Sequence, residues 1–174
     1  KGKFVACNSK GQVVRLADKN SLQLLCGECV LWQTSSPCAL FFFHYHGTFS
    51  PSERLFVILG RAIRGYKFDG AVFVFDAASG KAVRMLPAYD NRSYPRVECA
   101  FLSDEEYLIS TNYTLRMFNL QSGQLLSVIA MESIVWSVTT SPPRRLVAVG
   151  LEGSSQGFKI MRVKSGEGLR KKFK

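Results

Sequence analysis

Five residues with metal-binding chemistry gather in the first third of the chain: Cys26, Cys29, Cys38, His44 and His46. Cysteine thiolate and histidine imidazole are ligands that zinc favours, and Cys-x-x-Cys is the spacing of a zinc knuckle. A single pair of this kind is also compatible with thiol redox chemistry, or with cysteines that only fill space between sheets. We favour the packing interpretation, and therefore predict no metal site and no bound cofactor.

The complete set of cysteines indicates a reducing environment. There are five of them at irregular spacings, which is not the pattern of a disulfide framework. We expect most of them to be small buried apolar residues in an intracellular protein, cytoplasmic or nuclear.

Catalytic motifs are missing from the sequence. We find no glycine-rich phosphate loop, no His-Glu-x-x-His helix and no recognisable Ser-His-Asp arrangement. Carboxylates number only 13, and several of them fall in predicted turns. We therefore predict that the chain is not an enzyme.

Arginine and tyrosine are concentrated in two segments, residues 60–69 and 87–95, which we expect to be loops on one face of the molecule. These two residue types often dominate protein–protein contacts, and loops on a rigid scaffold commonly carry function. The alternative is a longer hairpin with solvated tips. The predicted partner-binding residues are Arg61, Arg64, Tyr66, Lys67, Tyr89, Arg92 and Tyr94.

Positive charge collects at the carboxyl end of the sequence. The net charge is +10, and residues 140–174 hold nine basic residues against two acidic ones. Such a cluster can bind RNA or another anionic surface, or it can be a solvated tail that keeps the chain soluble. The predicted basic patch consists of Arg144, Arg145, Arg170, Lys171, Lys172 and Lys174.

The elements that would position these residues follow from an internal repeat. Gly80, Gly123 and Gly166 are 43 residues apart, and each follows a serine. An apolar run precedes each Ser-Gly turn and another follows it, which is typical of a β-hairpin. Because a four-stranded propeller blade takes about 40 to 45 residues, the interval predicts one blade per repeat.

The run Phe-Ser-Pro, then Leu-Phe-Val, then Val-Phe-Asp-Ala-Ala-Ser-Gly-Lys resembles WD-repeat β-propellers. The resemblance implies an all-β propeller with about four four-stranded antiparallel blades in a single domain, residues 1–174. Approximate blades are 1–27, 38–88, 95–131 and 134–174, of which the first is expected to be incomplete. The usual Trp-Asp pair that ends the third strand is replaced by Phe75-Asp76, Phe118-Asn119 and Val163-Lys164.

The resemblance also implies a function. WD-like propellers serve as non-catalytic protein-interaction scaffolds. We therefore expect this chain to be a segment of a larger intracellular protein and to bind protein partners. We expect the remaining blades of a larger ring to be partners too; a small closed propeller is the alternative. No apolar stretch approaches the roughly 20 residues of a membrane span.

Overall fold

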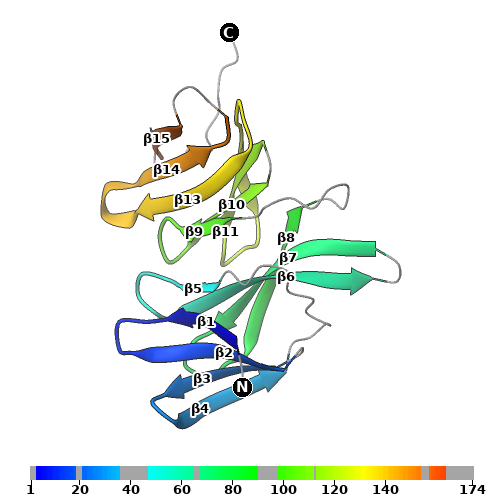
Figure 1. Ribbon diagram of the computed structural model, residues 1–174, viewed down its shortest axis with the longest axis vertical. Coiled ribbons are helices and arrows are strands. Elements are labelled where there is room, and N and C mark those ends of the chain that lie inside the picture. The colour runs from blue at the N-terminus through cyan, green and yellow to red at the C-terminus, as the bar shows by residue number, and fades with distance from the viewer. Residues whose placement is uncertain are drawn as a thin grey trace. The chain divides into compact units, whose positions relative to one another are not determined.

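The computed structural model describes residues 3–18, 21–35, 47–64, 67–89, 98–111, 113–153 and 157–163. The chain divides into two compact units, Lys1–Ser93 and Tyr94–Lys174. Each unit contains two antiparallel β-sheets, in which strands consecutive in the sequence lie side by side (Figure 1). The predicted all-β architecture of four antiparallel sheets is therefore confirmed.

The first unit holds two four-stranded sheets. The strands of the first sheet are β1 (Lys3–Cys7), β2 (Gln12–Asp18), β3 (Ser21–Cys26) and β4 (Cys29–Ser35). Those of the second sheet are β5 (Gly47–Phe49), β6 (Leu55–Arg64), β7 (Lys67–Asp76) and β8 (Ala82–Tyr89).

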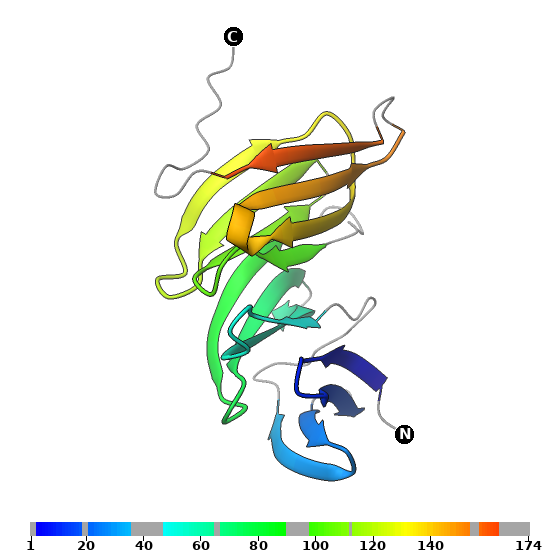
Figure 2. The same ribbon diagram turned by 90° about the vertical axis from the view of Figure 1, so that its left-hand side faces the viewer.

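The second unit holds a four-stranded sheet and, among the described residues, a three-stranded one. The third sheet consists of β9 (Cys99–Phe101), β10 (Glu106–Thr111), β11 (Thr114–Asn119) and β12 (Leu125–Ala130). The fourth, coloured yellow to red in Figure 2, consists of β13 (Val135–Ser141), the 3₁₀ turn η1 (Pro142–Arg144), β14 (Leu146–Leu151) and β15 (Phe158–Arg162). The end of the predicted blade 134–174, from residue 164 onward, lies outside the described residues.

The prediction of an incomplete first blade is wrong. The first sheet has four strands, because β4 pairs with β3 beyond the predicted blade end at residue 27. The turn between β3 and β4 contains only Gly27 and Glu28, and Gly27 has the positive φ (57°) that a two-residue hairpin needs. This turn lacks the Ser-Gly pair of the other repeats, so a search for that pair passes over it.

The 43-residue interval corresponds to a repeated turn. The Asp76 carboxylate accepts a hydrogen bond from the Ser79 backbone N–H, and the Asn119 amide oxygen accepts one from Ser122, both at 2.8 Å. The glycine that follows each serine donates its N–H to the same Asp or Asn carbonyl, again at 2.8 Å. Side chain and backbone therefore close both turns in the same way.

The fourth sheet corrects the alignment of its repeat. The Val163 N–H donates to the Arg145 carbonyl, just as the N–H groups of Ala77 and Leu120 donate to the carbonyls of Arg54 and Glu105, the residues immediately before the second strands of their sheets. Arg162 therefore occupies the position of Asp76 and Asn119. The prediction of Val163-Lys164 at the Trp-Asp position is two residues too late. Asp76 and Asn119 each lie three residues before the serine of their turn, and three residues before Ser165 is Arg162.

The outermost strands share an irregularity. The register of β4, β8 and β12 slips by one residue at the same place, which leaves Leu31, Val83 and Leu126 as bulge residues. A bulge strengthens the local twist and makes an edge strand a poor template for pairing with other chains. The repeated unit therefore includes a bulge that protects its outermost strand.

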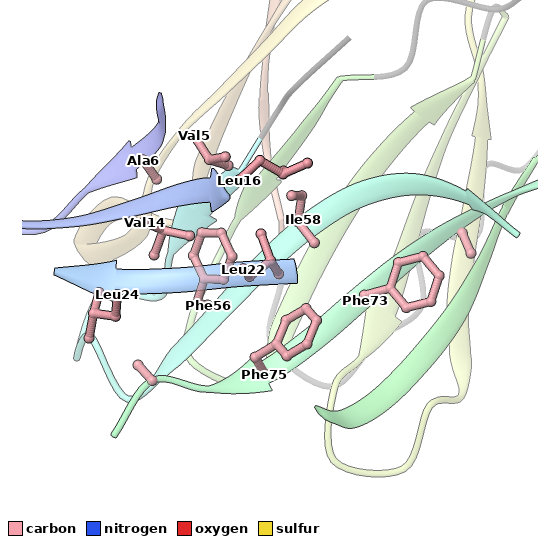
Figure 3. Close-up of a cluster of buried hydrophobic side chains, with 12 residues drawn as sticks. Val5, Ala6, Val14, Leu16, Leu22, Leu24, Phe56, Ile58, Phe73 and Phe75 are labelled. Atoms are coloured by element: carbon pink, nitrogen blue, oxygen red, sulfur yellow. The ribbon is translucent and has the colours of Figure 1, made fainter. Parts of the chain in front are cut away.

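Each unit buries a core between its two sheets. In the first unit, alternate residues of β2 and β3 face alternate residues of β6 and β7, and Figure 3 shows Phe56 beside Val14 and Leu22, with Phe75 and Phe73 further along the same core. The second unit has an aliphatic core instead: Leu102, Leu115, Met117, Ile129, Met131, Val135, Val138, Val147, Val149, Leu151 and Val163. Period-two alternation therefore places the apolar side chains between the sheets.

Candidate protein-interaction surface

The hairpin formed by β6 and β7 is longer than its counterpart in the second unit. β6 and β7 pair from Leu55 opposite Asp76 to Arg64 opposite Lys67, over ten positions, whereas β10 and β11 pair over six. We call the additional residues, 61–64 and 67–70, the β6–β7 arm. Figure 1 shows it continuing beyond the rest of its sheet.

The expectation that residues 60–69 form a loop is therefore wrong. Apart from residues 65 and 66, which lie outside the described part, the segment is strand. We read its glycines as loop signals, although the Arg, Ile and Phe between them are compatible with an extended hairpin. The alternative of a longer hairpin is the correct one.

Few neighbouring strands accompany the arm. β5 pairs with β6 only from Phe56 to Ile58, and β8 reaches no further than Tyr89 opposite Gly70. Within the described part of the sheet, the pairs beyond Arg61 and Gly70 therefore form a two-stranded ribbon. Such a ribbon leaves backbone N–H and C=O groups along its edges without a strand partner.

The structure gathers several predicted partner-binding residues at this end of the second sheet. Arg61, Arg64 and Lys67 belong to the arm, and Tyr89 ends β8. Arg61 and Tyr89 both lie in register with Gly70, on opposite sides of it. Three further predicted residues lie outside the described residues: Tyr66, Arg92 and Tyr94.

The predicted basic patch is represented in the structure by two residues. Arg144 is exposed at the end of η1. Arg145 donates two hydrogen bonds to the Glu106 carboxylate, at 2.6 and 3.1 Å, and a third from Nε to the Val163 carbonyl at 3.1 Å. Its charge is therefore offset within the unit. The rest of the patch lies outside the described residues: Arg170, Lys171, Lys172 and Lys174.

The expectation that most cysteines are buried fails for three of the four described ones. Cys7, Cys26 and Cys29 are exposed, and only Cys99 is buried; none of the four is in a disulfide. Cys26 and Cys29 are directly opposite each other at the end of the β3–β4 hairpin. Within the described residues, no cluster of three or more His, Cys, Asp or Glu side chains could hold a metal ion. Cys38, His44 and His46 are outside that part.

Trp32, a residue that we did not single out in the sequence, connects the two sheets of the first unit. Its indole N–H donates a hydrogen bond to the Ala77 carbonyl at 2.9 Å, and its ring covers Gly80 so closely that an added Cβ would lie 2.6 Å away. The run from Val30 to Thr34, which follows the Cys-Gly turn and is rich in residues that favour strands, was a signal available in the sequence. We did not recognise β4, so we missed it.

The outward face of the fourth sheet is exposed although the equivalent faces of the other sheets are buried. Phe158 and Ile160 of β15 are 63% and 60% exposed. The 43-residue interval aligns them with Leu115 and Met117 of β11, which are 0% and 2% exposed, and with Val72 and Val74 of β7, which are 0% and 1% exposed. We call the surface formed by Phe158 and Ile160 the fourth-sheet face.

Two carboxylates of the first unit have lowered pKa values. The hydroxyl and backbone N–H of Ser79 lower the pKa of the Asp76 carboxyl, and hydrogen bonds from Ser9 lower that of Glu53. The Ser9 N–H lies 2.6 Å from Glu53 and joins the first turns of the two sheets. In the second unit, burial raises the pKa of the Tyr107 hydroxyl well above its ordinary value.

In the described part of the chain, no helix has the length and apolar character needed to cross a membrane.

Comparison with known proteins gives a fold but no family. No protein-family model matches the chain, and no curated protein matches it. Among solved structures, the chain is similar to the β-propeller domain of Cps50 (Swd1) from Myceliophteria thermophila, with a TM-score of 0.67 and 13% sequence identity. The match covers 94% of this chain and 55% of that one. The chain therefore has the fold of a β-propeller segment and spans about half of the structure that it matches.

Proposed function

We propose that the chain is a non-catalytic protein-interaction platform, part of a propeller in a larger intracellular protein, and that the β6–β7 arm is its main contact element. The observation that carries this proposal is the greater length of the β6–β7 hairpin, which has four more residue pairs than the equivalent hairpin β10–β11. Within the described residues, no further strand pairs with the outer part of this ribbon. Recognition of a partner is a reason for keeping it.

The charge of the arm favours an acidic partner. Residues 61–70 contain Arg61, Arg64 and Lys67 against Asp69. Basic residues steer an acidic surface toward them, and arginine can bind carboxylates through two hydrogen bonds at once. Tyr66, Tyr89, Arg92 and Tyr94 remain the candidate neighbours of this contact.

A photo-crosslinking experiment tests the arm. A benzoylphenylalanine at position 66 should crosslink a protein partner in cells, and the same group at Val83, an exposed residue of the neighbouring strand β8, should not. Replacing Arg61, Arg64 and Lys67 by alanine should weaken the crosslink at least tenfold. Replacing Lys10, Lys81 and Arg144 instead removes equal charge elsewhere and should leave it unchanged. Equal crosslinks from positions 66 and 83, or equal loss in both triple variants, would contradict the proposal.

We also propose that another sheet of the same propeller covers the fourth-sheet face. The support is the exposure of Phe158 and Ile160 at positions that are buried in the other sheets, together with the 55% coverage of the similar propeller. In a propeller each blade packs against two neighbours. A cysteine at position 160 should react rapidly with maleimide in this chain and slowly in a longer natural chain that contains it. A cysteine at position 83 should react rapidly in both, and equal labelling of position 160 in both chains contradicts the covering sheet.

A further inference from the structure

The turn between the third and fourth strands joins its positions i and i+3 through side chains in two of the sheets. In the second sheet, the Ser79 hydroxyl donates to the Asp76 carboxylate at 2.7 Å. In the third sheet, the Ser122 hydroxyl donates to the Asn119 amide oxygen at 3.1 Å. Both links stand at the end of the third strand, where the chain turns back into the outermost strand.

The first sheet has two cysteines at the corresponding turn. Cys26 ends β3 as Asp76 ends β7, and Cys29 is the register partner of Cys26 at the start of β4. The bulge residues Leu31 and Val83 mark the same point of the following strand, so Cys29 corresponds to Lys81, and the loop of the first sheet is two residues shorter. The pair therefore spans the same turn that the other two sheets close with a side-chain link.

The geometry of the hairpin permits a bond between the two sulfur atoms. Cys26 and Cys29 are register partners in adjacent antiparallel strands, so their side chains leave the sheet on the same face. Directly opposite residues of such strands have Cα atoms roughly 4.5 to 5.5 Å apart, within the range of about 4.4 to 6.8 Å found for disulfides. Both thiols are exposed and unbonded to another sulfur.

We propose that Cys26 and Cys29 form a reversible dithiol–disulfide pair, oxidised by a small-molecule disulfide such as oxidised glutathione. One cysteine thiolate attacks the glutathione disulfide, forms a mixed disulfide and releases the first glutathione thiol. The second cysteine attacks the protein sulfur of the mixed disulfide and releases the second glutathione. The chain loses two electrons and two protons, and one glutathione disulfide becomes two thiols.

The small size of the loop makes the bond a reversible modification and not a structural bridge. A disulfide stabilises a fold mainly by closing long loops, and this one encloses only Gly27 and Glu28. Its position gives it a local effect, because β4 carries Trp32, whose indole is bonded to Ala77 of the second sheet. Oxidation therefore restricts the motion of the turn that precedes β4.

Equilibration of the whole reduced chain in glutathione buffers of graded oxidation tests the proposal. After quenching with an alkylating reagent, mass spectrometry of the peptide from residues 20–54 should show that Cys26 and Cys29 lose their free thiols together. Neither cysteine should carry a glutathione adduct. The oxidised glutathione needed should be at least tenfold lower than that which modifies Cys7, another exposed cysteine of the same sheet.

Serine variants separate the pair from a single reactive thiol. Cys29→Ser should retain glutathione on Cys26 as a stable mixed disulfide, and Cys7→Ser should oxidise at Cys26 and Cys29 as the unmodified chain does. The measurement on the unmodified chain stands even if a variant folds poorly. The proposal is overturned if Cys26 and Cys29 remain thiols, if each carries its own glutathione at the concentration that modifies Cys7, or if either pairs with Cys38.

Discussion

The two units fasten neighbouring sheets with different chemistry. In the first unit, aromatic side chains fill the core and the neutral indole of Trp32 donates to a backbone carbonyl of the second sheet. In the second unit the core is aliphatic, and a two-pronged ion pair between Arg145 and Glu106 joins the sheets. The Thr140 hydroxyl adds a hydrogen bond to the Phe101 carbonyl. One arrangement of strands therefore tolerates two kinds of connection between neighbouring sheets.

The largest expected effect comes from the aromatic core. Phe73 is fully buried, so Phe73→Ala should lower the free energy of unfolding of the first unit by roughly 3 to 5 kcal/mol. The chain has two tryptophans, Trp32 in the first unit and Trp136 in the second. Fluorine NMR of 5-fluorotryptophan protein in urea would follow each unit separately. Equal shifts of both unfolding transitions would show that the two cores do not act separately.

A pair of glycine substitutions isolates the Trp32 contact. Gly80 and Gly11 have similar positive φ angles, 69° and 72°, but an added Cβ would meet Trp32 at Gly80 and nothing within 4 Å at Gly11. Gly11→Ala should cost about 1 to 2 kcal/mol from backbone strain alone. Gly80→Ala should cost a further 1 to 3 kcal/mol, roughly, because the ring must move. Urea unfolding of both variants measures the difference, and equal costs would mean that Trp32 yields without penalty.

The ion pair of the second unit should show a smaller, salt-dependent effect. The side chains of Arg145 and Glu106 are 25% and 15% exposed. Glu106→Ala should lower the free energy of unfolding of this unit by about 1 to 2 kcal/mol at low salt, and by less in concentrated salt. Glu105→Ala, next to it in the sequence, serves as the control. A loss that is independent of salt would assign the effect to packing instead of charge.

The smallest expected effect is a change in how the stability of the first unit responds to acid. Because the Asp76 pKa is lowered in the folded state, its contribution to stability is present above the ordinary value of 3.8 and is lost as the pH falls through the lowered pKa. Asn119 makes the same turn in the second unit without a titrating group. Asp76→Asn should therefore make the stability of the first unit less sensitive to acid. Unfolding titrations between about pH 5 and pH 2 would measure this, and an unchanged acid response would point to Glu53, whose pKa is also lowered.

How far the fold could be predicted depended on whether a contact was local. The turns at Asp76 and Asn119 are closed by residues three and four positions away, so they recur in the sequence and revealed the repeat. The turn at Cys26 performs the same task with different residues, and β4 was missed with it. The glycines of the arm favour a loop when only local sequence is considered, because nothing local distinguishes a long hairpin from an inserted loop.

The connections between sheets were beyond sequence reasoning for another reason. Arg145 and Glu106 are 39 residues apart, and Trp32 and Ala77 are 45 apart. Neither pair recurs at the 43-residue interval, so no pattern in the sequence indicates these two contacts. Among the predicted partner-binding residues, the backbone brings Arg61 and Tyr89 to one row of the second sheet.

The turn after the third strand has a practical use. Its first position is occupied by Cys26, Asp76 and Asn119 in the first three sheets, and in each of them the strands before and after the turn remain paired with each other. A position that accepts a thiol, a carboxylate and an amide tolerates several kinds of side chain. It is therefore a suitable place to attach a fluorophore or to insert a short epitope when the assembly of this propeller is followed in cells.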